Sequence, residues 1–152
     1  PNNIYNKPNS IFVADFVGSP SMNFISGHIK KDEDVSSFFP DNEKQKSINF
    51  DSINLKVNNS DEILLGIRPE HIFLKKEHAV RVTKDHKFAE IEVNPELHEY
   101  IGHEQIVTFN YYGQEILGKF SSSINIEIDK KMTLFVDLNS VSLFDKETKR
   151  RI

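Results

Sequence analysis

Apolar and polar residues alternate in short runs over most of the chain from residue 22 onward. Residues 53–57 and 89–93 show the pattern most clearly, because an aliphatic side chain stands at every second position. A period of two places successive side chains on opposite faces of a strand, so each run predicts a strand with one buried face. On this basis the sequence predicts strands over 22–30, 47–57, 62–67, 88–93, 106–111, 115–120, 124–128, 132–138 and 141–144.

Two other segments depart from this pattern. Residues 8–17 carry apolar side chains at helical spacing, Gly18 is placed to cap a helix, and Pro20 prevents its continuation. Residues 31–45 are polar and charged around Phe38-Phe39, and they predict a loop that tucks both rings onto the sheet. Many short strands with one short N-terminal helix are typical of an antiparallel sandwich or small barrel. We therefore expect a mainly β fold.

Composition and charge narrow the class of protein. The 152 residues include 19 Lys and Arg against 23 Asp and Glu, a net charge of −4. This acidic balance argues against a dedicated nucleic-acid binder, which normally carries a basic stripe. The chain has no Cys, which excludes disulfides, thiolate metal sites and a cysteine nucleophile. No apolar run approaches the roughly 20 residues that a membrane-spanning helix needs, so we expect no direct membrane insertion.

Motifs that would carry catalysis are absent from the sequence. It contains no Gly-rich phosphate loop and no nucleophile elbow. His98 and His103, with the carboxylates between and beside them, could form a site for a hard metal ion, but exposed strand-end residues are the favoured interpretation. His71 follows Glu70, and neighbouring side chains usually point apart. The acidic runs 32–34 and 96–104 show no sign of the unequal environments that catalytic carboxylates require. We therefore assign no catalytic, cofactor-binding or metal-binding residue.

Three segments, in this order, carry a resemblance to a known family. They are PNSIFVADFVGSPSMNF at residues 8–24, LGIRPEH at residues 65–71, and LFDKET at residues 143–148 with Arg151-Ile152 after it. A looser fourth segment, EYIGHE, occupies residues 99–104. Together they resemble the C-terminal regulatory part of ATP-binding subunits of carbohydrate ABC importers, of the maltose, multiple-sugar and glycerol-phosphate type.

The resemblance implies a fold and a division of the chain. The fold is one or more small OB-like antiparallel β-barrels of the TOBE or MOP-like kind, in agreement with the strand pattern. Residues 1–20 would be the last helix and linker of an ATPase domain that precedes them, and residues 21–152 the regulatory domain. Residues 31–61 are longer than the family usually has and would be an insertion, and Lys149 stands where a Gly is usual.

The resemblance also implies partners and a location. ATP and Mg²⁺ would bind the upstream domain, so this fragment is expected to be non-catalytic and to hold no cofactor. Its partners would be the upstream ATPase domain, a second copy of the same subunit, and permease subunits reached through the ATPase domain. The location would be the cytoplasmic face of the cell membrane. The candidate interface or structural residues are Arg68, Pro69, Glu70, His71, Glu99, Gly102 and Glu104.

Alternatives remain open at this stage. Arg68 before Pro69 could be a structural strand exit with a local ion pair, as readily as part of an interface. The whole domain could be a small-ligand barrel that binds a sugar or an oxyanion. An oligonucleotide-binding OB domain is a third hypothesis, for which Tyr111 and Tyr112 with Lys119 are the nearest approach to a stacking surface. The sequence does not predict the transported sugar or the role of residues 31–61.

Overall fold

The computed structural model describes residues 21–33, 35–51, 61–78 and 87–152, and nearly all regular structure in them is β. Two compact units share the chain. The first comprises Pro1–Gly66 together with Ser140–Ile152, and the second comprises Ile67–Asn139. The second unit is therefore a continuous segment that interrupts the first. The predicted helix over residues 8–17 lies outside the described residues.

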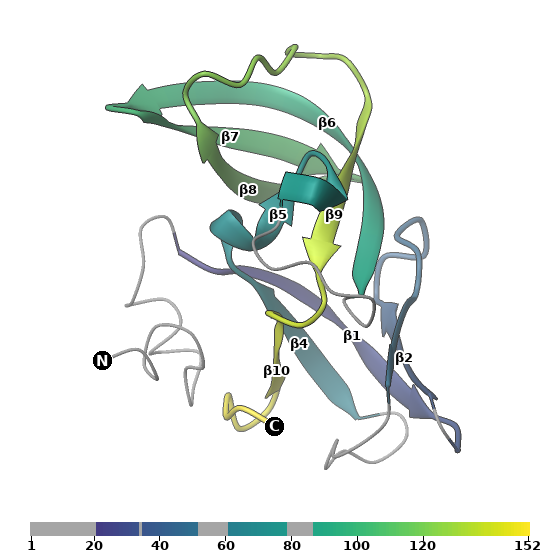
Figure 1. Cartoon of the computed structure of the whole chain (residues 1–152). Coiled ribbons are helices and arrows are strands. Elements are labelled where there is room, and N and C mark those ends of the chain that lie inside the picture. The colour runs from purple at the N-terminus through teal and green to yellow at the C-terminus, as the bar shows by residue number, and fades with distance from the viewer. Residues whose placement is uncertain (1–20, 34, 52–60, 79–86) are drawn as a thin grey trace. The chain divides into compact units, whose positions relative to one another are not determined.

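The first unit contains one five-stranded sheet in the order β10-β4-β1-β2-β3. Neighbouring strands pair antiparallel wherever their register is described, and Figure 1 shows β1, β2, β4 and β10 in its lower part. The strand bounds are β1 Asn23–Lys31, β2 Val35–Pro40, β3 Ile48–Asp51, β4 Glu62–Ile67 and β10 Ser142–Asp145. Strand β10 comes from the end of the chain, yet it completes a sheet whose other members all lie before residue 68.

The loop predicted over residues 31–45 is wrong. Residues 35–40 form strand β2, which pairs with β1 on one side and β3 on the other. The segment misled the prediction because polar and apolar residues do not separate between the two faces of β2: Ser36 is buried, whereas Val35 is exposed. Phe38 is fully buried, as expected, whereas Phe39 points to the other face, where the ammonium group of Lys30 lies 5.1 Å from its ring centroid.

A close approach of backbone to side chains shapes the first unit. Phe144 on β10 is fully buried, and its ring meets that of Phe24 edge-on at 5.8 Å between centroids. A Cβ at Gly66 would collide with the sulfur of Met22 and lie 3.0 Å from the Phe144 ring. Glycine at position 66 therefore lets Met22 and Phe144 pack directly on the backbone of β4.

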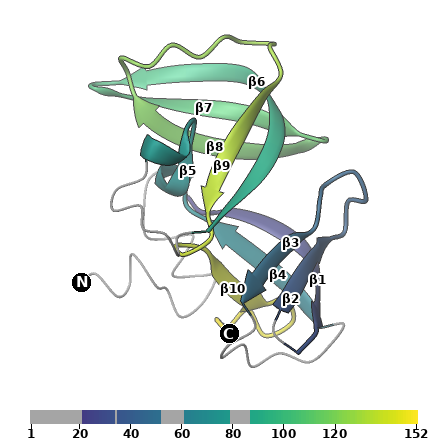
Figure 2. The same cartoon turned by 45° about the vertical axis from the view of Figure 1, so that its right-hand side comes forward.

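The second unit contains the sheet β5-β9-β6-β7-β8, which curls on itself in both views (Figures 1 and 2). Its elements are β5 Ile72–Phe73, β6 Phe88–Ile101, β7 Glu104–Tyr111, β8 Gln114–Ser121 and β9 Met132–Asp137, with 3-10 turns η1 Pro69–His71 and η2 Lys76–His78. A mainly β unit with a curled sheet is consistent with the expected OB fold.

Strand β6 is longer than the predicted 88–93 because it serves two ladders in succession. Its first half, up to Val93, pairs with β9, and its second half, from Asn94, pairs with β7. The register shifts between Pro95 and Leu97, so the strand contains a β-bulge at the point of transfer. Proline has no N–H to donate, and bulges are among the few places where a sheet tolerates it.

Two further predictions on the second unit have opposite outcomes. The strands predicted over 106–111 and 115–120 are confirmed as β7 and β8. They are joined at Tyr112-Gly113, where both residues have positive φ, 51° and 92°, as tight hairpin turns require. The strand predicted over 124–128 is wrong, since residues 122–131 form turns and irregular structure. Ile126 is nevertheless buried, and the amide of Gln105 donates to the carbonyl groups of Ser121 and Ile124. The alternation of isoleucines thus reflects a pinned loop with a buried side chain.

The close packing of β1 on β2 yields a stability prediction. A Cβ at Gly27 would collide with the carbonyl oxygen of Phe39 and lie 2.6 Å from the Phe38 ring. Because a backbone atom cannot yield, Gly27→Ala is expected to lower the free energy of unfolding by about 2 kcal/mol. Chemical denaturation of both proteins measures the difference. Lys30→Ala, at an exposed position of the same strand, is the control and should cost less than about 1 kcal/mol; equal losses would contradict the steric explanation.

Candidate interaction site on the second unit

The segment Arg68-Pro69-Glu70-His71 connects β4 to β5 through the 3-10 turn η1. Arg68 is extended, with φ −76° and ψ 142°, and Pro69 occupies the first position of the turn, where a missing N–H is tolerated. The His71 N–H closes the turn by donating to the Arg68 carbonyl at 3.0 Å. Turn η1 packs against β8. The motif is therefore the turn in which the chain leaves β4, and the restricted φ of Pro69 favours this turn.

Burial determines the electrostatics of this segment. Arg68 is only 1% exposed and is the largest fully buried side chain among the described residues, and burial lowers its pKa. Burial also lowers the pKa of the half-buried His71, against the smaller opposing effects of the Glu70 and Asp137 carboxylates; the Arg68 charge adds to the lowering. The segment therefore favours a neutral His71 ring next to a buried guanidinium group.

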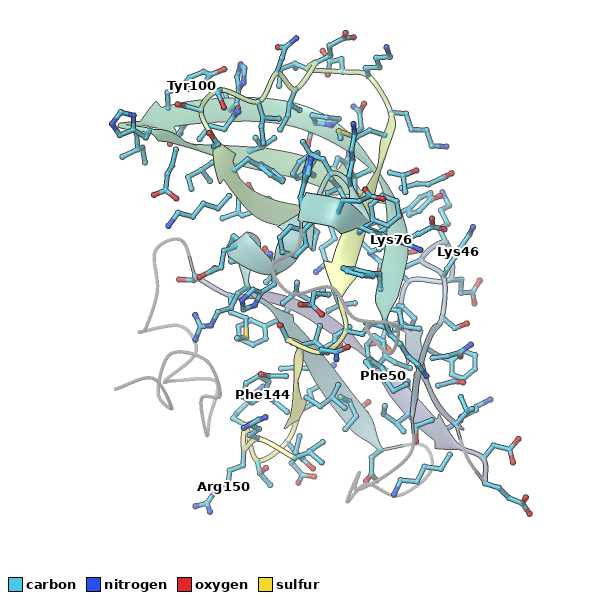
Figure 3. The ribbon with its side chains drawn as sticks, in the orientation of Figure 1. Lys46, Phe50, Lys76, Tyr100, Phe144 and Arg150 are labelled. Atoms are coloured by element: carbon cyan, nitrogen blue, oxygen red, sulfur yellow. The ribbon has the colours of Figure 1, made fainter. Side chains whose placement is uncertain are left out.

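The second predicted set lies on the β6–β7 hairpin. Gly102 occupies its turn with φ +61°, a conformation that other residues rarely adopt. The Glu104 carboxylate forms an ion pair with the Lys119 ammonium group, with 3.4 Å between Oε2 and Nζ. Tyr100, labelled in Figure 3 near the end of this hairpin, is 57% exposed and its ring lies 5.0 Å from that of His98. In Figures 1 and 3 the hairpin turn lies away from η1, so the two predicted sets do not form one site.

The side of the β6–β7–β8 sheet that faces away from the buried side chains forms a second feature, which we call the outer face. Inward positions of β7 and β8 are buried, including Val107, Phe109 and Ile116. The outward positions are aligned across the three strands in rows, which the pairing register defines. These rows are Ile101–Glu104–Ser121, Glu99–Ile106–Lys119 and Leu97–Thr108–Leu117.

Sequence reasoning missed most of this face. It identified Glu99 and Glu104 but not the apolar residues beside them, because β6 was predicted to end at Val93. The alternation of the strand continues past the bulge with its phase shifted by one residue, so Leu97 emerges outward instead of inward. The signal that could have found it is the pair Leu97 and Ile101, which bracket Glu99 at the spacing of one strand face.

Groups that could support chemistry are sparse in the described part of the chain. No set of three or more His, Asp or Glu residues there is arranged to hold a metal ion. Burial and the neighbouring Tyr112 raise the pKa of Tyr111 to about 12, so its phenol stays protonated. In the first unit, His28 lies 3.2 Å from Asp41, and Asp41 also accepts a hydrogen bond from Ser26 at 2.8 Å. These are exposed surface contacts, which contribute little to stability.

The contacts of the charged residues on the β6–β7 hairpin do not test the two alternatives from the sequence, a metal site at His98 and His103 and catalytic carboxylates in residues 96–104. Glu104 pairs with Lys119, and the His98 ring contacts Tyr100. The absence of any assigned catalytic or cofactor-binding residue therefore stays a prediction. The helices of the described segments include none with the length and hydropathy of a membrane span.

Comparison with known proteins confirms the resemblance indicated by the sequence motifs. The family model for the MalK OB fold domain matches residues 18–72. A trehalose/maltose import ATP-binding protein, MalK, from Thermococcus litoralis is 29% identical over 152 residues, which is 100% of this chain and 40% of the relative. The sn-glycerol-3-phosphate import ATP-binding protein UgpC from Vibrio vulnificus is 30% identical over 99% of this chain and 37% of its own length.

The chain spans about 40% of the length of these relatives. The oligosaccharides import ATP-binding protein MsmX from Bacillus subtilis is 26% identical over 100% of this chain and 40% of its own length. Among solved structures, the cytoplasmic molybdate-binding protein ModG shares the fold with a TM-score of 0.57, over 80% of this chain and 94% of that one. Their sequence identity is 10%, so this likeness concerns the fold alone.

The environment of His71 predicts a pH dependence of stability. Its pKa is lowered in the folded protein from the ordinary 6.5, so below pH 6.5 the unfolded chain binds more protons than the folded one. The free energy of unfolding should therefore be fully maintained above that pH and fall as pH drops through 6.5 toward the lowered pKa. His71→Gln should flatten this part of the profile. Denaturation at pH 5 to 7.5 measures both proteins, and parallel profiles would contradict the prediction.

Proposed function

We propose that this chain is the non-catalytic regulatory and dimerisation part of the ATP-binding subunit of a sugar ABC importer. The single observation that carries the proposal is that 99% or more of the chain aligns with import ATP-binding proteins for trehalose and maltose, for oligosaccharides and for sn-glycerol-3-phosphate. The protein that contains this chain is, in this proposal, an ATPase that binds ATP and Mg²⁺ upstream.

The physical basis of a dimerisation role is effective concentration. Two ATPase domains that hydrolyse ATP between them must separate and meet again in each cycle. Domains joined through a second contact meet as an intramolecular event, so they do not diffuse apart between cycles. Such a contact requires a self-complementary patch related by a two-fold axis. Permease subunits would then be reached through the ATPase domains, at the inner face of the cell membrane.

Self-association of the purified chain tests the proposal. Sedimentation equilibrium from about 10 μM to 1 mM should show a monomer–dimer equilibrium, because a contact that is assisted by the ATPase domains need only be weak by itself. The same preparation should not hydrolyse ATP. A chain that stays monomeric throughout this range would contradict the dimerisation role, and turnover of ATP that depends on its own residues would contradict the non-catalytic role.

A small-ligand barrel is the second candidate, and one observation favours it. The fold resembles that of ModG, a molybdate-binding protein whose structure contains bound molybdate. An oxyanion or a sugar bound by this chain would make it a sensor instead of, or in addition to, a tether. The low sequence identity means that ligand-binding residues cannot be transferred between the two proteins.

Calorimetry separates the second candidate from the first. Titration of the chain with molybdate, sulfate, phosphate, maltose and trehalose is expected to show no binding tighter than about 1 μM, a free energy of roughly −8 kcal/mol. Saturable binding at that level by any of the five would make the ligand-binding function the leading one. Sedimentation in the presence of that ligand would then show whether binding and association are coupled.

A further inference from the structure

Two large aliphatic side chains stand exposed on the outer face of the β6–β7–β8 sheet. Leu97 is 53% exposed and Ile101 64%, and both lie on the outward side of β6. Ile106 and Leu117, on the neighbouring strands of the same face, are half-buried. Single exposed apolar residues are common on soluble proteins, but apolar residues gathered on one face mark an interaction surface.

The bulge in β6 is what brings Leu97 to this face. Before the bulge, Val93 and Pro95 point inward and are buried. Regular alternation would also have turned Leu97 inward, whereas the shifted register pairs it with the outward Thr108. The bulge thus moves Leu97 from the core side to the solvent side, where it adds to the apolar surface that a contact with another chain would bury.

The charges on the same face follow the pairing register. In the middle row, Glu99 on β6 and Lys119 on β8 flank Ile106 on β7. In the next row, Leu97 and Leu117 flank Thr108 in the same way. These two rows therefore have an apolar or neutral residue in the centre and complementary ends, acidic with basic or leucine with leucine. The third row, Ile101–Glu104–Ser121, has Glu104 in its centre, where the Lys119 ammonium group of the same copy lies 3.4 Å from it.

We propose that the outer face is the surface through which two copies of this chain dock, related by a two-fold axis that runs parallel to β7. Rotation about that axis places β6 of one copy over β8 of the other without shifting the rows. Glu99 then faces the partner's Lys119, Leu97 faces the partner's Leu117, and Ile106 meets the partner's Ile106. Glu104 meets the partner's Glu104, and each of the two carboxylates is paired with the Lys119 of its own copy. This inference rests on the dimerisation role proposed above and names the surface that performs it.

The alternative two-fold arrangement is unfavourable. An axis perpendicular to the strands would place β6 over β6 and, at the middle row, Glu99 over Glu99. The same arrangement places Lys119 over Lys119, so both charged positions of the middle row meet like charges, which oppose association. The axis parallel to β7 opposes only Glu104 with Glu104 and joins Glu99 with Lys119 twice, so the charge pattern favours the axis parallel to β7. Lys119 already contacts Glu104 within its own copy, and Glu99 of the second copy would extend this pair to a network of three charges.

Charge reversal tests both the surface and its geometry. Glu99→Lys alone should weaken self-association about ten-fold, because both copies then oppose Lys119 with a lysine, and Lys119→Glu alone should do the same with two glutamates. An equimolar mixture of the two variants should associate nearly as well as the wild type, because every facing pair is again of opposite charge. Lys130→Glu, a reversal in the exposed loop 122–131, is the matched control and should change nothing.

Chemical crosslinking provides a second, independent readout. The chain has no Cys, so a single introduced cysteine reacts alone with a short bismaleimide. Thr108→Cys, close to the proposed axis, should give a covalent dimer in high yield. Thr133→Cys, at an exposed position of β9 away from this face, should give only the background level.

The outcomes separate this inference from the proposed function. If the wild type associates but neither reversal weakens it, or the mixture fails to recover, the outer face is not the interface and the dimerisation role stands on another surface. If Thr108→Cys and Thr133→Cys crosslink equally, the geometry is overturned. If the wild type is monomeric up to about 1 mM, both the dimerisation role and this interface fall, and a different partner for the outer face would follow.

Discussion

The bulge between Pro95 and Leu97 is the constraint on which the second unit depends. A single strand, β6, must complete one ladder with β9 and then another with β7, and the two ladders require the strand to bend. Proline removes a backbone donor at that point, and the extra residue turns the strand and shifts its phase. The curled sheet, the buried interior of β7 and β8, and the outward position of Leu97 all follow from this one local departure from regular pairing.

Two large buried polar side chains, those of Gln105 and Arg68, lie next to segments that connect one strand to another. Gln105 is fully buried on β7, and its amide holds two carbonyl groups of the segment that leaves β8. Arg68 is buried where β4 ends and η1 begins. Buried polar side chains of this kind stabilise one particular conformation of the connecting segment, because in another conformation they would be buried without their hydrogen-bond partners. The irregular segments of this protein are thus specified as closely as its strands.

The sequence predicts the β class and most strands of the described residues, because period-two alternation is a direct consequence of strand geometry. It fails where that alternation has another cause or is interrupted. Strand β2 was missed because polarity does not follow its two faces: Ser36 is buried, whereas Val35 and Phe39 are exposed. Residues 124–128 alternate without pairing, since a buried Ile126 in a pinned loop produces the same pattern. The candidate site was found only in its charged part, because β6 was predicted to end at Val93 and the bulge that exposes Leu97 depends on tertiary pairing. Whether Arg68 to His71 take part in an interface stays a prediction.

The place of β10 in the first sheet has a consequence for how the protein is made. The second unit is continuous and is complete once residue 139 has been synthesised, whereas the first sheet lacks its final strand until residues 142–145 emerge. Until then β4 has an open edge, and the cavity that the Phe144 side chain fills stays empty. A ribosome that stalls or terminates between residues 139 and 142 would therefore release a chain with one finished unit and one unfinished unit, which exposes an unpaired strand to quality-control proteases.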